Sequence, residues 1–99
     1  MINKDYADYA WEQTAALLAI DSPSGFTRRA AEWVRDAFEA LGFPAKITTK
    51  GGVLADLGGE NADDGLFLEA HSDTLGAMVA QIKGSGRLRL TGVGGMEPN

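Results

Sequence analysis

Apolar residues recur every three or four positions near the start of the chain, and this spacing predicts an amphipathic helix. The helix runs from Lys4 to Ile20, because no Pro or Gly interrupts that stretch and Asn3 or Asp5 can cap its first turn. Its apolar stripe contains Trp11 and the pair Leu17–Leu18. We expect this stripe to face the core of the domain rather than a ligand.

The same spacing predicts a second helix from Thr27 to Leu41. A turn at Ser22–Gly25 separates the two helices, and Ser24 can cap the second one from outside. Gly42 suits a left-handed residue at the C-terminal end, and Pro44 prevents the helix from continuing. We expect both helices to pack on one face of a sheet.

After the second helix the chain changes to alternating or β-rich segments. Ala45–Thr49 and Val53–Leu57 predict a hairpin closed by the turn Lys50-Gly51-Gly52. A second hairpin is predicted from Ala77–Ile82 and Leu88–Leu90, which flank another glycine turn.

An apolar run between the hairpins predicts a central strand. Leu66–Ala70 follows the turn residues at 63–65, and such a run suits a strand that is covered on both faces. Because two helices precede the strands, the order of elements predicts an α/β fold with a mixed sheet. Ligands of open α/β sheets bind at the carboxyl ends of strands, so the residues after Ala70 are candidates for chemistry.

His71 is the only histidine of the chain, and Asp73 lies two residues beyond it. Side chains two positions apart in extended backbone point the same way, so Asp73 can reach the His71 ring. A neutral imidazole binds Zn²⁺ or Co²⁺, and a neighbouring carboxylate can fix the orientation of the ring. A single histidine is more often a satisfied or exposed side chain than a ligand, and the spacing alone leaves both interpretations open.

The surrounding residues resemble a known family. The stretch Ala70-His71-Ser72-Asp73-Thr74-Leu75-Gly76-Ala77-Met78-Val79 is similar to the first metal-binding motif of the M42 metalloaminopeptidases, in which a strand ends in His-x-Asp, followed by an apolar residue and Gly. Asp21–Phe26 resembles the turn after the first helix of that family, Lys50–Gly52 its first hairpin, and Gly92–Gly95 the segment after its second. The more distant M20 peptidases share the core His-x-Asp-Thr.

The resemblance implies a function for each part of the chain. His71 would be a ligand of one of two divalent metal ions, Zn or Co, and Asp73 would be the catalytic-site carboxylate that orients it. Residues 1–76 would form the N-terminal part of a zinc-peptidase-like α/β/α sandwich, and residues 77–99 the start of an inserted β domain. The family's remaining ligands, bridging carboxylate and base fall beyond Asn99, so we expect weak or no metal binding and no activity from this chain alone.

We therefore predict the N-terminal fragment of a two-metal aminopeptidase that removes N-terminal residues from peptides through metal-activated water and that forms homo-oligomers. Two alternatives stay open. One is a fragment of an M20-like metallopeptidase or deacylase, although Gly76-Ala77-Met78-Val79 favours M42. The other is a non-catalytic module that binds a partner through uncovered sheet edges.

Composition and charge restrict the other possibilities. Hydrophobic residues make up 44% and charged residues 23% of the chain, as in globular proteins, and the apolar runs are too short to span a membrane. A formal net charge of −5 with scattered basic residues argues against nucleic acid. The absence of cysteine excludes thiolate ligands, and a start without a secretory pattern predicts a cytoplasmic location.

Overall fold

The computed structural model describes residues 3–95 of the chain. Two helices, α1 (Lys4–Leu18) and α2 (Arg28–Ala40), are followed by two antiparallel hairpins. Strand β1 (Ala45–Ile47) pairs with β2 (Val53–Ala55), and β3 (Gly76–Ile82) pairs with β4 (Leu88–Val93). These helices and strands are consistent with the α/β class, but the described residues form two separate two-stranded sheets instead of the predicted mixed sheet.

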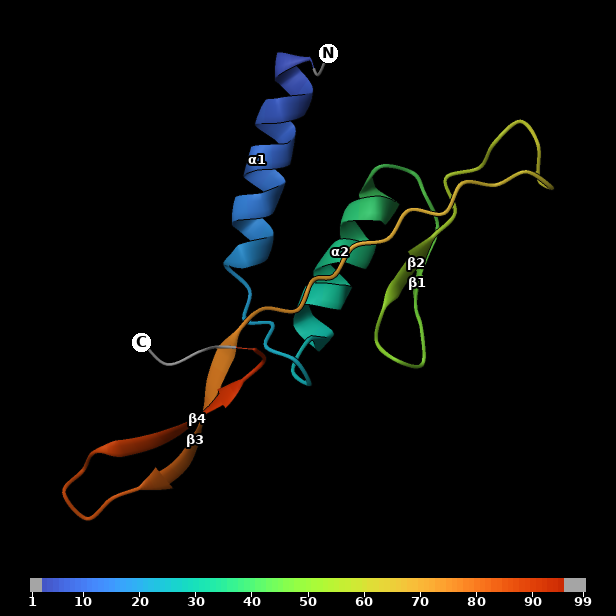
Figure 1. Cartoon of the computed structure of the whole chain (residues 1–99). Helices are drawn as coiled ribbons and strands as arrows, with labels where there is room; N and C mark the ends of the chain where they lie inside the picture. Colours follow the sequence, from blue (N-terminus) through green and yellow to red (C-terminus); the bar gives the residue numbers. More distant parts are fainter. Residues whose placement is uncertain (1–2, 96–99) are drawn as a thin grey trace.

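The packed centre of the molecule lies between α2 and the first hairpin. The apolar residues that are buried in the described chain, Ala30 and Ala31, both belong to α2, which contacts both β1 and β2. Strand β1 alternates as its sequence predicts, because Ala45 and Ile47 are half-buried while Lys46 between them is exposed. Figure 1 shows this centre with α1 extending from one side and the β3–β4 hairpin from the other.

The helix limits follow the sequence signals to within two residues. The side chain of Asn3 caps α1 by accepting a hydrogen bond of 2.9 Å from the amide of Asp5. Gly42 follows the end of α2 with a φ of +90°, the left-handed conformation that its position predicted. Ser24 does not cap α2, because the N-cap residue is Thr27, which makes no side-chain capping bond.

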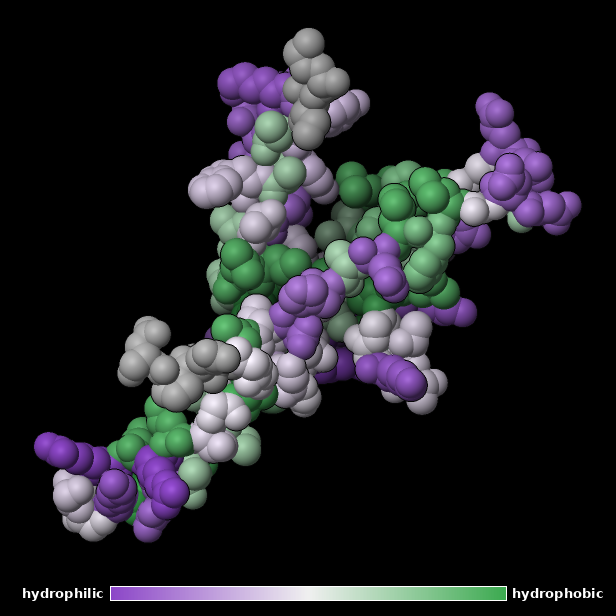
Figure 2. Space-filling view, in the orientation of Figure 1, coloured by the Kyte–Doolittle hydropathy of each residue, from purple (hydrophilic) through white to green (hydrophobic). Residues whose placement is uncertain are grey.

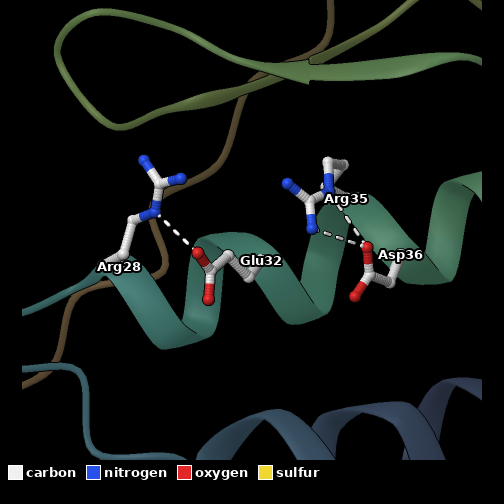
Figure 3. A network of polar contacts seen from close by, with 4 residues as sticks. All are labelled: Arg28, Glu32, Arg35 and Asp36. Atoms are coloured by element: carbon white, nitrogen blue, oxygen red, sulfur yellow. Dashed lines mark hydrogen bonds and ion pairs between the residues drawn. The ribbon is translucent and has the colours of Figure 1, made fainter.

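Ion pairs lie on the surface of α2. Arg28 donates to Glu32 one turn later at 2.8 Å, and Arg35 lies 2.9 Å from Asp36 (Figure 3). Exposed pairs of this kind stabilise a fold little. Because their charges are matched within the helix, these two arginines do not provide a free basic surface.

The prediction that α1 turns its apolar stripe to a core is wrong. No residue of α1 is buried, and Trp11 and Leu18 are 76% and 65% exposed. Among the helices and strands of the described chain, α1 contacts α2 and no other element. The amphipathic pattern did form a helix, but within the described residues only Leu17 of the stripe is half-buried, while Trp11 and Leu18 remain exposed.

The prediction of a central strand at Leu66–Ala70 is also wrong. These residues lie in irregular, exposed backbone, and Leu66, Phe67 and Leu68 are each more than 70% exposed. A strand needs a neighbour to receive its backbone hydrogen bonds. No backbone hydrogen bond joins residues 65–71 to any other part of the described chain, so the apolar run has no sheet to enter.

Surface area and size both show that the chain is open. Its accessible surface is 8659 Å², whereas a compact monomer of 10.5 kDa exposes about 5,400 Å². Its radius of gyration is 17.9 Å, compared with about 13 Å for a compact domain of this length. Figure 2 shows apolar surface gathered over the central part and continuing toward α1. About 3,000 Å² of surface that a compact domain would cover is therefore exposed.

Candidate functional site

The loop between the two helices lies against the segment that leads into β3. The amide of Thr74 donates to the carbonyl oxygen of Ser22 at 2.7 Å, and Pro23 and Thr74 form an isolated parallel bridge. The loop is closed by a hydrogen bond of 2.8 Å from the amide of Phe26 to the carbonyl oxygen of Pro23. Residues 72–76 are therefore held by this loop, although the residues directly before them, 65–71, form no strand.

Gly76 permits the close approach of the two segments. A Cβ atom at this position would lie 2.8 Å from Cβ of Pro23, a distance that real Cβ atoms essentially never show. Ser22, the residue before this proline, is 2% exposed. The glycine of the predicted motif thus has a steric reason, which is contact with a proline more than fifty positions earlier.

His71 and Asp73 lie in contact beside this loop. Nδ1 of His71 is 3.0 Å from Oδ1 of Asp73 and 3.1 Å from the carbonyl oxygen of the same residue. A carboxylate and a carbonyl oxygen can only accept hydrogen bonds, so the ring carries its proton on Nδ1 and donates it. The lone pair of a neutral ring is then on Nε2, and because the side chain is 86% exposed a ligand can approach it.

Ser24 binds the other oxygen of the Asp73 carboxylate. Its hydroxyl donates to Oδ2 at 2.6 Å, so both carboxylate oxygens accept a hydrogen bond. The hydroxyl of Ser24, and after it the ring of His71, lower the pKa of Asp73 below its ordinary value, because both hydrogen bonds favour the charged form. The three side chains thus form a chain of contacts from hydroxyl to carboxylate to imidazole.

The structure brings together the two residues that the sequence singled out and adds a third. Sequence reasoning treated Ser24 only as a helix cap and did not connect it with Asp73. A signal was present, because Asp21–Phe26 and the His71 motif belong to the same family resemblance. His71 lies in irregular backbone before β3 and not at the end of a strand, since Leu66–Ala70 forms none.

The donor set of the described chain does not complete a metal site. Within residues 3–95 no group of three or more potential His, Asp or Glu ligands lies close enough to hold an ion. Stable zinc sites have three or four protein ligands. His71 fits the role of one ligand, through Nε2, and Asp73 fits the role of a carboxylate that orients a ligating imidazole.

No helix within residues 3–95 is long and apolar enough to cross a membrane.

Comparison with known proteins identifies the family. The model of the M42 glutamyl aminopeptidases matches residues 51–99, a range that contains His71 and Asp73. The chain belongs to this family of peptidases.

Two curated relatives agree with that assignment. A Bacillus subtilis (strain 168) protein named "Putative aminopeptidase YhfE" is 36% identical over 83 residues, which cover 84% of this chain and 24% of the relative. The "Glutamyl aminopeptidase" of Lactococcus lactis subsp. cremoris (strain MG1363) is 29% identical over 90 residues, which cover 89% of this chain and 25% of the relative. The chain thus spans about a quarter of the length of the curated relatives it matches.

Proposed function

We propose that this chain forms the N-terminal part of a metalloaminopeptidase that hydrolyses the peptide bond after a free N-terminal residue. The observation that carries the proposal is the geometry of His71. Its Nδ1 is within hydrogen-bond distance of two acceptors, the carbonyl oxygen and Oδ1 of Asp73. The other ring nitrogen, Nε2, is therefore available to a metal ion. The family match over residues 51–99 supports the same reading, because it includes this motif.

Each site residue has a distinct role in this proposal. His71 binds one of two divalent ions, Zn or Co, through Nε2, and Asp73 holds the ring in the required orientation. Bound metal ions in such enzymes polarise the scissile carbonyl and make water nucleophilic at neutral pH. The other ligands, the bridging carboxylate and the general base belong to sequence outside these 99 residues. The chain alone therefore binds metal weakly or not at all and does not turn over substrate.

The proposal extends to the surroundings of the site. Residues 1–76 belong to a catalytic α/β/α sandwich, and residues 77–99 lead into an inserted β domain. The rest of the sandwich covers the stripe of Trp11 on α1 and the apolar run Leu66–Leu68, which accounts for the exposure of both. The β3–β4 hairpin projects away from the α2 centre (Figure 1), as a connection to another domain would. The complete protein takes peptide substrates and assembles as a homo-oligomer.

The test begins with the gene, by reading whether the frame continues beyond Asn99. Three proteins are then compared: the 99-residue chain, the extended chain, and the extended chain with His71→Ala. Release of a chromophore from amino-acid anilides is measured with added Co²⁺ or Zn²⁺, together with metal content and calorimetric metal affinity. Ser85→Ala, in the turn between β3 and β4, is the control variant.

Of the three proteins, we expect only the extended chain with His71 intact to turn over substrate at the full rate. Loss of a carboxylate that orients a ligand typically costs about 10- to 100-fold, so His71→Ala should lower activity by more than about 100-fold and reduce the bound metal. Turnover by the short chain, or full activity in the extended His71→Ala variant, would contradict the assignment of His71.

A non-catalytic interaction module is the second candidate. The exposure of Leu66, Phe67 and Leu68 favours it, because an extended apolar segment without hydrogen-bond partners can pair with another chain. A frame that stops after Asn99 would support this candidate over the enzyme.

A further inference from the structure

We propose that Ser24 is a positioning residue, whose hydroxyl sets the carboxylate of Asp73 and thereby holds His71 in the tautomer that leaves Nε2 free. The inference rests on the proposed role of His71 as a metal ligand. It assigns to the site a residue that lies 49 positions before Asp73 in the chain.

The contacts give the physical basis for this role. A carboxylate that is held through only one of its two oxygens can rotate about its Cβ–Cγ bond. The side chain of Asp73 is 45% exposed, so packing alone does not fix the orientation of its carboxylate. The hydroxyl of Ser24 holds Oδ2 at 2.6 Å, which leaves Oδ1 directed at Nδ1 of His71 at 3.0 Å. A carboxylate that accepts from Nδ1 favours the tautomer with the proton on that nitrogen.

Backbone contacts hold the position of Ser24, and these contacts do not involve its hydroxyl. The hydrogen bond from the amide of Thr74 to Ser22 and the bridge between Pro23 and Thr74 anchor the residues directly before Ser24 to the residue directly after Asp73. Gly25 then turns the chain with a φ of +86°, and Phe26 closes the turn. Removal of one hydroxyl should therefore leave the loop in place.

The hydroxyl is also not needed by the helix that follows. Thr27 is the N-cap residue of α2, and the hydrogen bond that the structure gives the Ser24 side chain is the one to Asp73. The carbonyl oxygen of Asp73 also lies 3.1 Å from Nδ1. It continues to accept from the ring when the carboxylate rotates, so we expect loss of the hydroxyl to shift the tautomer ratio and not to invert it completely.

The tautomer can be measured directly, because His71 is the only histidine. The ¹⁵N resonances of the imidazole are recorded on the metal-free 99-residue chain at about pH 8.5, where an ordinary imidazole is neutral. The parent, Ser24→Ala, Ser24→Thr and the control Ser85→Ala are compared. Exchange of the Thr74 amide proton is followed in parallel as the measure of loop docking.

We expect Ser24→Ala to lower the ratio of Nδ1–H to Nε2–H by about two- to tenfold, the range for one hydrogen bond. Ser24→Thr, which keeps a hydroxyl, should restore the parent ratio, and Ser85→Ala should match the parent. Thr74 exchange should change by less than about twofold in all variants. These results together would support a positioning role.

Two results would overturn it. An unchanged tautomer ratio in Ser24→Ala would show that the carboxylate does not need the hydroxyl. A changed ratio accompanied by faster Thr74 exchange would show that Ser24 only anchors the loop. Because no metal or substrate is present, neither result depends on the enzyme assay, so failure of this inference is distinguishable from failure of the proposed function.

Discussion

The substitution Gly76→Ala tests whether the loop at residues 22–26 holds the start of β3 in solution. A methyl group at this position would lie 2.8 Å from Cβ and 3.5 Å from Cγ of Pro23, whereas ordinary contacts begin at 3.4 Å. One segment must therefore move by about 0.6 Å or more. The proline ring is rigid and is tied to Thr74 by the backbone bridge, so it cannot simply rotate away.

The expected magnitude follows from this contact. Overpacking of this kind costs about 1–3 kcal/mol. Gly76 does not have a positive φ, so backbone strain does not add to the effect. If the cost falls on the contact between loop and strand, the population of the open form rises by about 5- to 150-fold.

Hydrogen exchange of the Thr74 amide is the assay, because that amide donates to Ser22 across the contact. It should exchange about 5- to 150-fold faster in Gly76→Ala. The amide of Lys83, bonded to the carbonyl oxygen of Arg87 at 2.9 Å, reports on the far end of the hairpin and should not change. The control is Gly84→Ala, where an added Cβ meets nothing within 4 Å and φ is not positive.

Two results would refute the reasoning. Unchanged Thr74 exchange in Gly76→Ala would mean that the loop and β3 are not in contact in solution. Equal acceleration at Thr74 and Lys83 would mean that the substitution destabilises the chain generally, and the steric account of Gly76 would fail.

Acid should release the contact between Ser24 and Asp73. The pKa of Asp73 is lowered in the folded chain from its ordinary 3.8. The stabilisation that the Asp73 carboxylate gives the fold is therefore fully present above pH 3.8, and it is lost as the pH falls through the lowered pKa. The carboxyl ¹³C resonance should therefore titrate at higher pH in Ser24→Ala than in the parent, and identical titrations would contradict this. The chain should also self-associate, because Leu66–Leu68 is exposed and unpaired. Sedimentation at several concentrations should show less association for Phe67→Asp, whereas a parent that stays monomeric throughout would exclude this surface.

Local patterns determined the helices and the hairpins. The three-and-four spacing of apolar residues and the Asn3 cap are complete within a few turns of chain, and so the limits of α1 and α2 could be predicted closely. The glycine turns of both hairpins are local in the same sense, since Gly51 and Gly86 adopt positive φ there. The proximity of His71 and Asp73 also follows from a spacing of two residues.

Burial and strand pairing could not be predicted in this way, because both depend on residues distant in the chain. The stripe of α1 and the run Leu66–Ala70 have the patterns of a core helix and a covered strand. In the described chain, however, Trp11 and Leu18 stay exposed and Leu66–Ala70 has no neighbouring strand. A hydrophobic pattern states which surface a segment would bury, and it does not state whether a partner is present. For the same reason the contact between Ser24 and Asp73 could not be predicted from the sequence. The two side chains meet only because the tertiary structure places Pro23 against Thr74 and Gly76.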